Sequence, residues 1–236
     1  MEKTPDFSPN FSSKSRLKSK IKFVIIHYTG MQSEIESIRR LKNPNSRVSC
    51  HYLINRKGKI FQMVNDNKTA WHAGKSKWKS FKNLNHSSIG IELVNKGKKF
   101  GYETFPKSQI KNLISLCKFL KRKYRIKREN FLGHSDIAPL RKNDPGEKFP
   151  WKKLSEIGIG KWYSNLKELN DLNKRKYRNF FFHNLHKIGY RYFNIKVRQK
   201  LDKKIISAFQ LRYLPNKVTG KLDKKTLKIS HFLANN

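Results

Sequence analysis

Two apolar segments that lie far apart in the sequence each end in a histidine. Ile21 to His27 contains four consecutive apolar residues, and Asn130 to His134 is a second, shorter segment. Runs rich in β-branched and aromatic residues are typical of buried strands. Two strand ends that each supply a histidine to one pocket can form an open metal site. Strands mixed with helices in this order favour an α/β layer fold around one sheet.

The segments between these two strands have recognisable periodicity. Ser33 to Leu41 carries apolar residues at helical spacing, with Ser33 as a candidate N-cap, and Lys107 to Tyr124 predicts a longer helix with one apolar face. The other predicted strands are Val48 to Ile54, Ile60 to Val64 and Ile89 to Val94. The first two of these flank the turn Asn55-Arg56-Lys57-Gly58, which predicts a hairpin.

The loop that follows the second strand is rich in ionisable side chains that could bind a metal or act in catalysis. Gly133-His134-Ser135-Asp136 is followed closely by Arg141-Lys142-Asn143-Asp144-Pro145-Gly146. A histidine and an aspartate from one loop can supply two of the three protein ligands of a catalytic zinc, and His27 is the third candidate. Zinc held in this way keeps a fourth position open for water and lowers the pKa of that water towards about 7.

Two further residues fit the same chemistry. Glu92 lies within the apolar strand from Ile89 to Val94, where a carboxylate needs a partner or a function, and it is a candidate general base. Lys142 is a candidate for stabilising the oxyanion that forms at an amide carbonyl. Simpler interpretations remain open: Glu92 could face solvent from an edge strand, His27 could be structural, and Lys142 could be surface charge.

Several short motifs occur in order between Ser8 and Trp151. They are Ser8-Pro9-Asn10-Phe11, Ile26-His27-Tyr28-Thr29, Ser49-Cys50-His51-Tyr52-Leu53-Ile54, Ala70-Trp71-His72-Ala73-Gly74, Ser88-Ile89-Gly90-Ile91-Glu92, Gly133-His134-Ser135-Asp136-Ile137-Ala138-Pro139, the Arg141 to Gly146 segment, and Phe149-Pro150-Trp151. Together they resemble the type-2 family of zinc-dependent N-acetylmuramoyl-L-alanine amidases.

The resemblance implies a fold and a reaction. The fold class is α/β, with a mixed central β-sheet flanked by helices. The reaction is zinc-dependent hydrolysis of the amide between N-acetylmuramic (or anhydro-muramic) acid and the L-alanine of peptidoglycan stem peptides. The implied roles are Zn²⁺ ligation by His27, His134 and Asp144, proton transfer by Glu92 and transition-state stabilisation by Lys142. Candidate substrate contacts are Trp71, His72 and Asn85, although His72 could instead be structural.

We expect three parts in the chain: an irregular N-terminal arm over residues 1–20, a zinc amidase domain over 21–165 and a small helical domain over 174–236. Apolar residues that could line the helices of the last part are Phe180, Phe181, Leu185 and Ile188, then Ile205, Ile206, Phe209 and Leu211, then Leu227 and Phe232 behind a cap at Asp223. Ala208-Phe209-Gln210 and Val218 to Asp223 resemble a peptidoglycan-binding helical domain. The alternative is a helical cap that only packs on the amidase domain.

A formal net charge of +38, with only 16 acidic residues, favours attraction to polyanions. The lysines are spread along the whole chain and no nucleic-acid-binding motif is present, so no specific nucleic-acid partner is expected. The expected partners are peptidoglycan or muropeptide fragments. The alternative to an amidase is a non-catalytic peptidoglycan-recognition protein of the same fold, which would usually lack a zinc ligand.

The cysteine content and the hydropathy of the chain indicate in which cellular compartment the protein acts. Cys50 and Cys117 fall in apolar segments and are expected as buried free thiols, with a disulfide left open. No segment is long and apolar enough to span a membrane. Residues 1–22 lack the apolar core of a secretory signal, which predicts a cytoplasmic protein; a periplasmic or wall-associated one is the alternative. We also expect a monomer.

Overall fold

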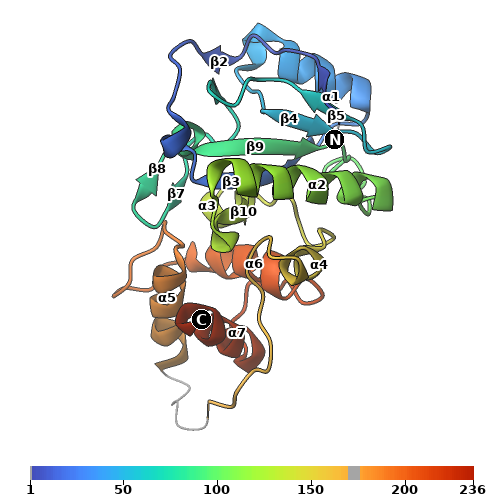
Figure 1. Cartoon of the computed structure of the whole chain (residues 1–236). Helices are drawn as coiled ribbons and strands as arrows, with labels where there is room; N and C mark the ends of the chain where they lie inside the picture. Colours follow the sequence, from blue (N-terminus) through green and yellow to red (C-terminus); the bar gives the residue numbers. More distant parts are fainter. Residues whose placement is uncertain (1, 170–175) are drawn as a thin grey trace.

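A mixed six-stranded sheet forms the centre of the protein, as expected. The computed structural model describes residues 2–169 and 176–236. The strand order is β1-β5-β4-β9-β3-β10, and only the β4–β5 pair is antiparallel (Figure 1). The strands are β1 (Thr4–Pro5), β3 (Phe23–Tyr28), β4 (Tyr52–Ile54), β5 (Ile60–Gln62), β9 (Ser88–Leu93) and β10 (Phe131–Gly133).

Helices and short strands surround this sheet. The helices of the first part are α1 (Glu34–Lys42), α2 (Lys107–Tyr124), α3 (His134–Ile137) and α4 (Trp151–Glu156), with 3-10 turns η1 (Lys18–Lys20), η2 (Pro44–Ser46), η3 (Leu84–Ser87) and η4 (Arg128–Asn130). The short strands are β2 (Phe11–Ser12), β6 (Thr69–Ala70), β7 (Lys77–Trp78) and β8 (Phe81–Lys82). Ser33 caps α1 as predicted, because its hydroxyl accepts from the Glu36 amide at 3.1 Å.

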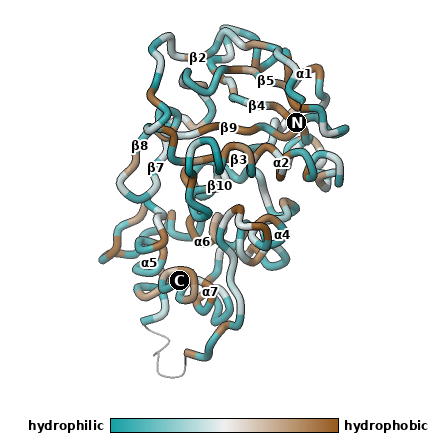
Figure 2. The backbone as a smooth tube through the Cα atoms, viewed as in Figure 1, coloured by the Kyte–Doolittle hydropathy of each residue, from teal (hydrophilic) through white to brown (hydrophobic). Residues whose placement is uncertain are grey.

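Alternation along the central strands decides which face of the sheet carries the chemistry. In β3, Val24 and Ile26 belong to the apolar cluster that includes α2, whereas Phe23 and Ile25 belong to a second cluster on the other face. Side chains two residues apart share a face, so His27 lies on the face opposite α2. Figure 2 shows the apolar character of these strands along the backbone tube.

The C-terminal helices share that second face. They are α5 (Tyr177–Ile188), α6 (Asp202–Tyr213) and α7 (Lys224–Asn235), and they gather beyond the β10 edge (Figure 1). One continuous apolar cluster joins them to the sheet; it includes Phe23, Ile25, Leu132 and Ile137 from the first part and Phe181, Leu185, Ile205, Ile206, Phe209 and Leu227 from the helices. Asp223 caps α7, since its carboxylate accepts from the Thr226 amide at 2.8 Å.

This shared core bears on the expected domain organisation. The helical part packs on the amidase part, because it covers apolar side chains of the central sheet. The predicted start at residue 174 lies outside the described residues. Residues 2–20 also differ from the expected irregular arm: β1 pairs in parallel with β5, and β2 pairs with β6. Strands of two residues are too short to show periodicity in a sequence.

Smaller differences concern element ends and redox state. The strand expected over Val48 to Ile54 is limited to β4, and His134 begins α3 instead of ending a strand. Cys50 and Cys117 are both buried and free, in accord with the expected thiols. Among the described residues, no helix combines the length and apolarity needed to cross a bilayer.

Candidate metal centre and active site

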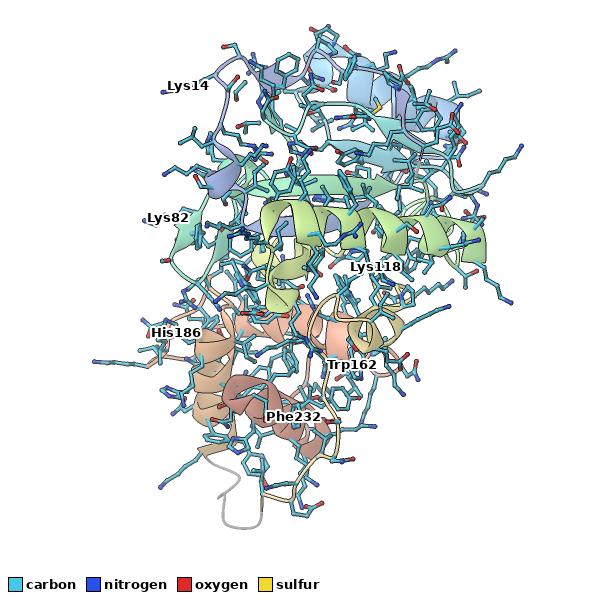
Figure 3. All side chains as sticks on the ribbon, viewed as in Figure 1. Lys14, Lys82, Lys118, Trp162, His186 and Phe232 are labelled. Carbon is cyan, nitrogen blue, oxygen red and sulfur yellow. The ribbon has the colours of Figure 1, made fainter. Side chains whose placement is uncertain are left out.

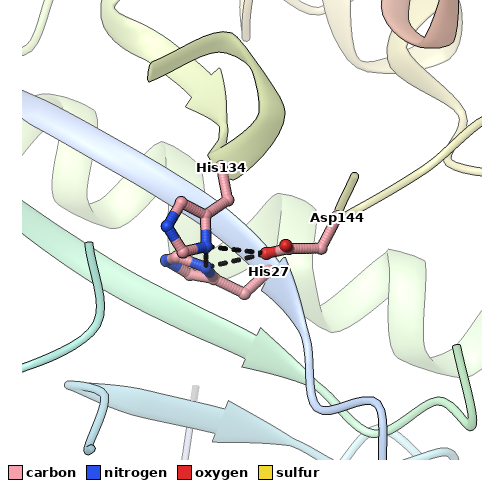
Figure 4. A group of neighbouring side chains, drawn as sticks. All are labelled: His27, His134 and Asp144. Carbon is pink, nitrogen blue, oxygen red and sulfur yellow. Dashed lines mark hydrogen bonds and ion pairs between the residues drawn. The ribbon is translucent and has the colours of Figure 1, made fainter. Parts of the chain in front are cut away.

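Three side chains from distant parts of the sequence bring their ligand atoms together. His27 Nδ1 lies 2.9 Å from His134 Nδ1 and 3.0 Å from Asp144 Oδ2, and His134 Nδ1 lies 3.1 Å from the same carboxylate oxygen (Figure 4). All three residues are buried. Figure 4 shows them pointing toward one shared point from β3, from the start of α3 and from the following loop.

The strand end and the loop are held in contact by backbone geometry. Ser135 donates its amide hydrogen to the Asp144 carbonyl at 2.9 Å, which fixes the loop against α3. Gly133 permits the close approach of Pro145, because a Cβ at this position would lie 2.8 Å from the proline Cδ. A side chain at residue 133 would therefore push the Asp144 loop away from the two histidines.

The donor set fits a zinc ion. Ligand atoms around a tetrahedral zinc with bonds of about 2.0–2.2 Å lie roughly 3.3–3.6 Å apart, a few tenths of an ångström more than the separations seen here. The Ala73 carbonyl, which can only accept, lies 3.1 Å from His134 Nε2 and favours the tautomer with a lone pair on Nδ1, although Arg141 Nη2 also lies 3.3 Å from Nε2. Two nitrogen lone pairs and a carboxylate facing one another repel unless a cation lies between them.

A chain of hydrogen bonds sets the tautomer of His27. The Ser88 hydroxyl donates to the Leu84 carbonyl, so Ser88 Oγ accepts from His72 Nε2 at 3.2 Å. Neutral His72 then has a lone pair on Nδ1, which accepts from His27 Nε2 at 3.0 Å. His27 is left with a free lone pair on Nδ1, the atom that faces His134 and Asp144.

The position of His72 in this chain depends on a glycine. A Cβ on Gly90 would lie 2.4 Å from the His72 ring. Sequence reasoning treated His72 as a substrate contact or a structural residue. Its contact with His27 gives it a role in orienting that ring.

Burial and neighbouring charge keep these groups in the form that binds a metal. Burial, reinforced by His134, lowers the pKa of His27 to about 4, so the ring is neutral near pH 7. Burial alone would raise the pKa of the Asp144 carboxyl, but the imidazoles of His134 and His27 hold it well below its ordinary value. Asp144 is therefore ionised and presents a negative charge to the two imidazoles.

Glu92 lies beside this centre on an inner strand. β9 is paired on both sides, and Glu92 is next to His27 in the β3–β9 register. The edge-strand interpretation of Glu92 is therefore wrong. Its Oε2 is buried and has no hydrogen-bond partner among the described residues. Burial, with the negative charge of Asp144, raises the pKa of Glu92 to about 8, while Lys142 opposes that rise.

Lys142 lines the same cavity and is partly buried. Its positive charge lowers the pKa of both His27 and Glu92. Its place in the lining of the cavity that His27 and Glu92 also line argues against an unrelated surface lysine.

The cavity has a volume of about 540 Å³ and contains most of the predicted site. Trp71 and His72 line it together with the five residues described above. Asn85 does not: its side-chain oxygen accepts from the amides of His72 and Ala73 at 3.1 and 2.6 Å. Asn85 therefore holds the segment that carries Trp71 and His72 and is not in contact with the cavity.

Several cations along the cavity were missed by sequence reasoning. They are Arg40 on α1, Lys98 and Lys99 in the loop after β9, and Arg141 next to Lys142. In a chain with 54 lysine and arginine residues, nothing in the sequence distinguishes these from surface charge. Arg141 also donates to the carbonyls of Ala73 and Lys75 and so closes one wall of the cavity.

Comparison with known proteins agrees with this geometry. The family model described as N-acetylmuramoyl-L-alanine amidase, Amidase_2, matches residues 17–147, which contain all five residues of the centre. The chain belongs to the N-acetylmuramoyl-L-alanine amidase family. The resemblance noted in the sequence is thereby confirmed.

Individual relatives extend the likeness beyond the matched region. The N-acetylmuramoyl-L-alanine amidase AmiD of Escherichia coli is 36% identical over 231 residues, covering 91% of this chain and 82% of that protein. The 1,6-anhydro-N-acetylmuramyl-L-alanine amidase AmpD of Haemophilus influenzae is 40% identical over 113 residues, covering 47% of this chain and 59% of that protein.

Two solved structures include the helical part as well. E. coli AmiD, in complex with the substrate anhydro-N-acetylmuramic acid-L-Ala-D-γ-Glu-L-Lys, superposes with a TM-score of 0.77 at 31% identity and covers 95% of this chain and 91% of that one. AMPDH3 of Pseudomonas aeruginosa gives a TM-score of 0.80 at 30% identity, with 96% of both chains covered. The amidase therefore shares its whole architecture, C-terminal helices included, with these enzymes.

Proposed function

We propose that this amidase is a zinc enzyme that hydrolyses the amide between the muramic acid lactyl group and the L-alanine of muropeptides. The observation that carries the proposal is the convergence of His27, His134 and Asp144 at a cavity that also holds Glu92 and Lys142. The substrates named for the AmiD and AmpD relatives support the choice of bond.

Each residue of the centre has a defined task. Zinc, when bound by His27, His134 and Asp144, would polarise the scissile carbonyl and acidify a water molecule. Glu92 takes a proton from the attacking water on its carboxylate. Lys142 stabilises the negative charge that develops on the carbonyl oxygen. Glu92 then returns the proton to the alanine nitrogen as the carbon–nitrogen bond breaks, which leaves a carboxylate and a free amine.

The alternative of a non-catalytic recognition protein has less support. Such a protein needs no general base, whereas the buried Oε2 of Glu92 lacks a hydrogen-bond partner among the described residues, at a cost in stability that a reaction explains. Cations are distributed over the molecule: Figure 3 shows Lys14, Lys82 and Lys118 at separate places around it.

Parallel digestion of two substrates tests the proposed function. Purified peptidoglycan and soluble anhydro-muropeptides are incubated with the zinc-loaded protein, and new alanine amino groups are quantified. Release from either substrate supports the amidase, and the ratio of the two rates shows which form is preferred. Binding of muropeptides without release of amino groups would instead favour the recognition protein.

Replacing Lys142 by alanine is expected to lower kcat about 100- to 1,000-fold, because removal of one oxyanion donor typically has that effect. Zinc content stays unchanged, since Lys142 does not belong to the ligand set. Steady-state kinetics and metal analysis of the purified variant measure both quantities. Lys153→Ala on the exposed side of α4 is the matched control and keeps the wild-type rate. A wild-type kcat in Lys142→Ala would remove this residue from the mechanism.

We also propose that the helical part binds the anionic cell wall. A groove of about 630 Å³ on its surface is lined by Tyr177, by the carboxylate of Asp223 and by four cations, Arg178, Lys203, Lys221 and Lys224. Stem-peptide carboxylates give the wall a negative charge that such a groove attracts. Deletion of the helices is a poor test, because it would expose the apolar face around Phe23 and Ile25.

Charge reversal tests the groove without disturbing that core. The triple variant Lys203→Glu, Lys221→Glu, Lys224→Glu is expected to bind insoluble peptidoglycan at least about tenfold more weakly at low salt, with the difference shrinking as salt screens the charges. The matched control reverses three exposed lysines of α2, Lys107, Lys111 and Lys118, and so carries the same net charge. Equal wall binding by the two triple variants in a pelleting assay would show that the groove has no special role.

A further inference from the structure

A buried carboxylate connects the metal centre to the C-terminal helices. Asp136 lies two residues after the ligand His134, within α3, and only 1% of its surface is exposed. Its carboxylate accepts three hydrogen bonds: from the Gly133 amide at 2.8 Å, from the Tyr190 hydroxyl at 2.5 Å and from Arg212 Nη1. The last two donors come from the helical part of the chain.

Arg212 also contacts the strand that precedes α3 and the first residue of α4. Its Nη2 donates to the carbonyl of Phe131 in β10 at 3.0 Å, and its guanidinium lies 4.0 Å from the centroid of the Trp151 ring. Arg212 is 3% exposed and Tyr190 is fully buried. One arginine of α6 thus contacts the strand that leads to His134, the turn that follows it and the first residue of α4.

The helix that carries His134 cannot hold its own position. α3 has four residues, which is a single turn, and an isolated turn has no stability in water. Its orientation must come from outside contacts. Charge-assisted hydrogen bonds in a buried environment are the strongest contacts available for this purpose. Arg212 and Tyr190 supply two contacts of this kind, both on Asp136.

We propose that Arg212 and Tyr190 are positioning residues of the metal centre, which act through Asp136 to hold His134 at its ligand position. The C-terminal helices are then part of the metal-binding apparatus, in addition to any role at the cell wall. The proposal rests on the proposed zinc site, because it concerns how tightly that site binds its metal.

Zinc affinity distinguishes positioning from a merely structural role. Tyr190→Phe removes one hydroxyl and keeps the ring that packs on Trp78. Arg212→Met removes both hydrogen bonds and keeps an unbranched side chain against Trp151. The dissociation constant for zinc is measured by chelator competition on the folded, metal-depleted full chain, and the absorption spectrum of the Co²⁺-loaded protein reports ligand geometry. We expect the dissociation constant to rise about 10- to 100-fold in each variant, as is typical when a group that orients a ligand is lost.

A control in the same helices separates this effect from general destabilisation. Ser230 accepts a buried hydrogen bond from the Asn184 side chain at 3.2 Å, between α7 and α5. Ser230→Ala is expected to lower Tm while leaving zinc affinity and the Co²⁺ spectrum unchanged.

The outcomes are distinct. Weaker zinc binding in Tyr190→Phe, with the control unaffected, supports the inference even if Arg212→Met fails to fold. Lower Tm with unchanged zinc affinity in both network variants would overturn it. If the wild-type chain binds no zinc, the proposed metal site is wrong and this inference falls with it.

Discussion

Replacing His134 by alanine is expected to leave a folded protein with almost no bound zinc and no measurable amide hydrolysis. Zinc-binding free energies of about 10–16 kcal/mol in four-ligand sites correspond to roughly 2.5–4 kcal/mol per ligand. Loss of one ligand should therefore weaken zinc binding by about two to three orders of magnitude. His27 and Asp144 remain, but two ligands do not hold zinc against dilution and a chelator.

The measurement is zinc per chain after gel filtration in the presence of a weak chelator. Wild type is expected to retain one zinc. His183→Ala on the exposed side of α5 is a matched histidine control and should retain it as well. Circular dichroism and Tm show whether His134→Ala is folded. One zinc per chain in the folded His134→Ala variant would exclude this residue as a ligand.

The grouping of His27, His134 and Asp144 could be predicted from the sequence because these residues lie at the end of a strand, directly after a strand, and in the loop that follows. His27 is the last residue but one of the apolar strand β3, His134 directly follows β10, and Asp144 lies directly before Pro145 and Gly146. Parallel strands that end at one edge of a sheet bring such residues together. The α2 helix and the hairpin strands could also be predicted from the sequence, because their hydrophobic periodicity extends over enough residues to be distinctive.

The parts that were not predicted depend on tertiary contacts that leave no local pattern. The Ser88–His72–His27 chain joins η3 and β9, the segment after β6, and β3, and nothing in the spacing of those residues indicates it. Asn85 has the polarity of a substrate contact, but its partners are two backbone amides. A side chain's chemical type suggests several roles, and only its neighbours decide between them.

The helical part illustrates the same limit at the scale of domains. Its helices and the Asp223 cap follow from periodicity. The packing of these helices on the sheet could not be predicted from periodicity. An apolar helix face has the same sequence pattern whether it packs within its own domain or on another one. Arg212 appeared in the sequence as one more cation among many. Its contact with Asp136 becomes visible only when α6 is placed against α3.

Replacing Glu92 by glutamine is expected to lower kcat by about 100- to 10,000-fold, the usual contribution of a general base, while zinc content and fold are retained. Glutamine has nearly the same shape, and the buried Oε2 that lacks a partner among the described residues is replaced by a neutral amide, so little destabilisation follows. The lost step is the transfer of the water proton and its return to the alanine nitrogen.

The pH dependence of kcat provides the sharper test of Glu92. Burial and Asp144 raise the pKa of this carboxyl to about 8 in the metal-free chain, and a bound cation would lower it. A base acts only when deprotonated, so the wild-type rate should rise with pH as Glu92 loses its proton. Glutamine does not titrate, so the residual rate of Glu92→Gln should lack this rise. Glu156→Gln, on the exposed side of α4, should keep both the rate and the profile of wild type. If Glu92→Gln retains the wild-type acid limb, another group is the base; if it retains the wild-type kcat, no base of the kind proposed acts in this enzyme.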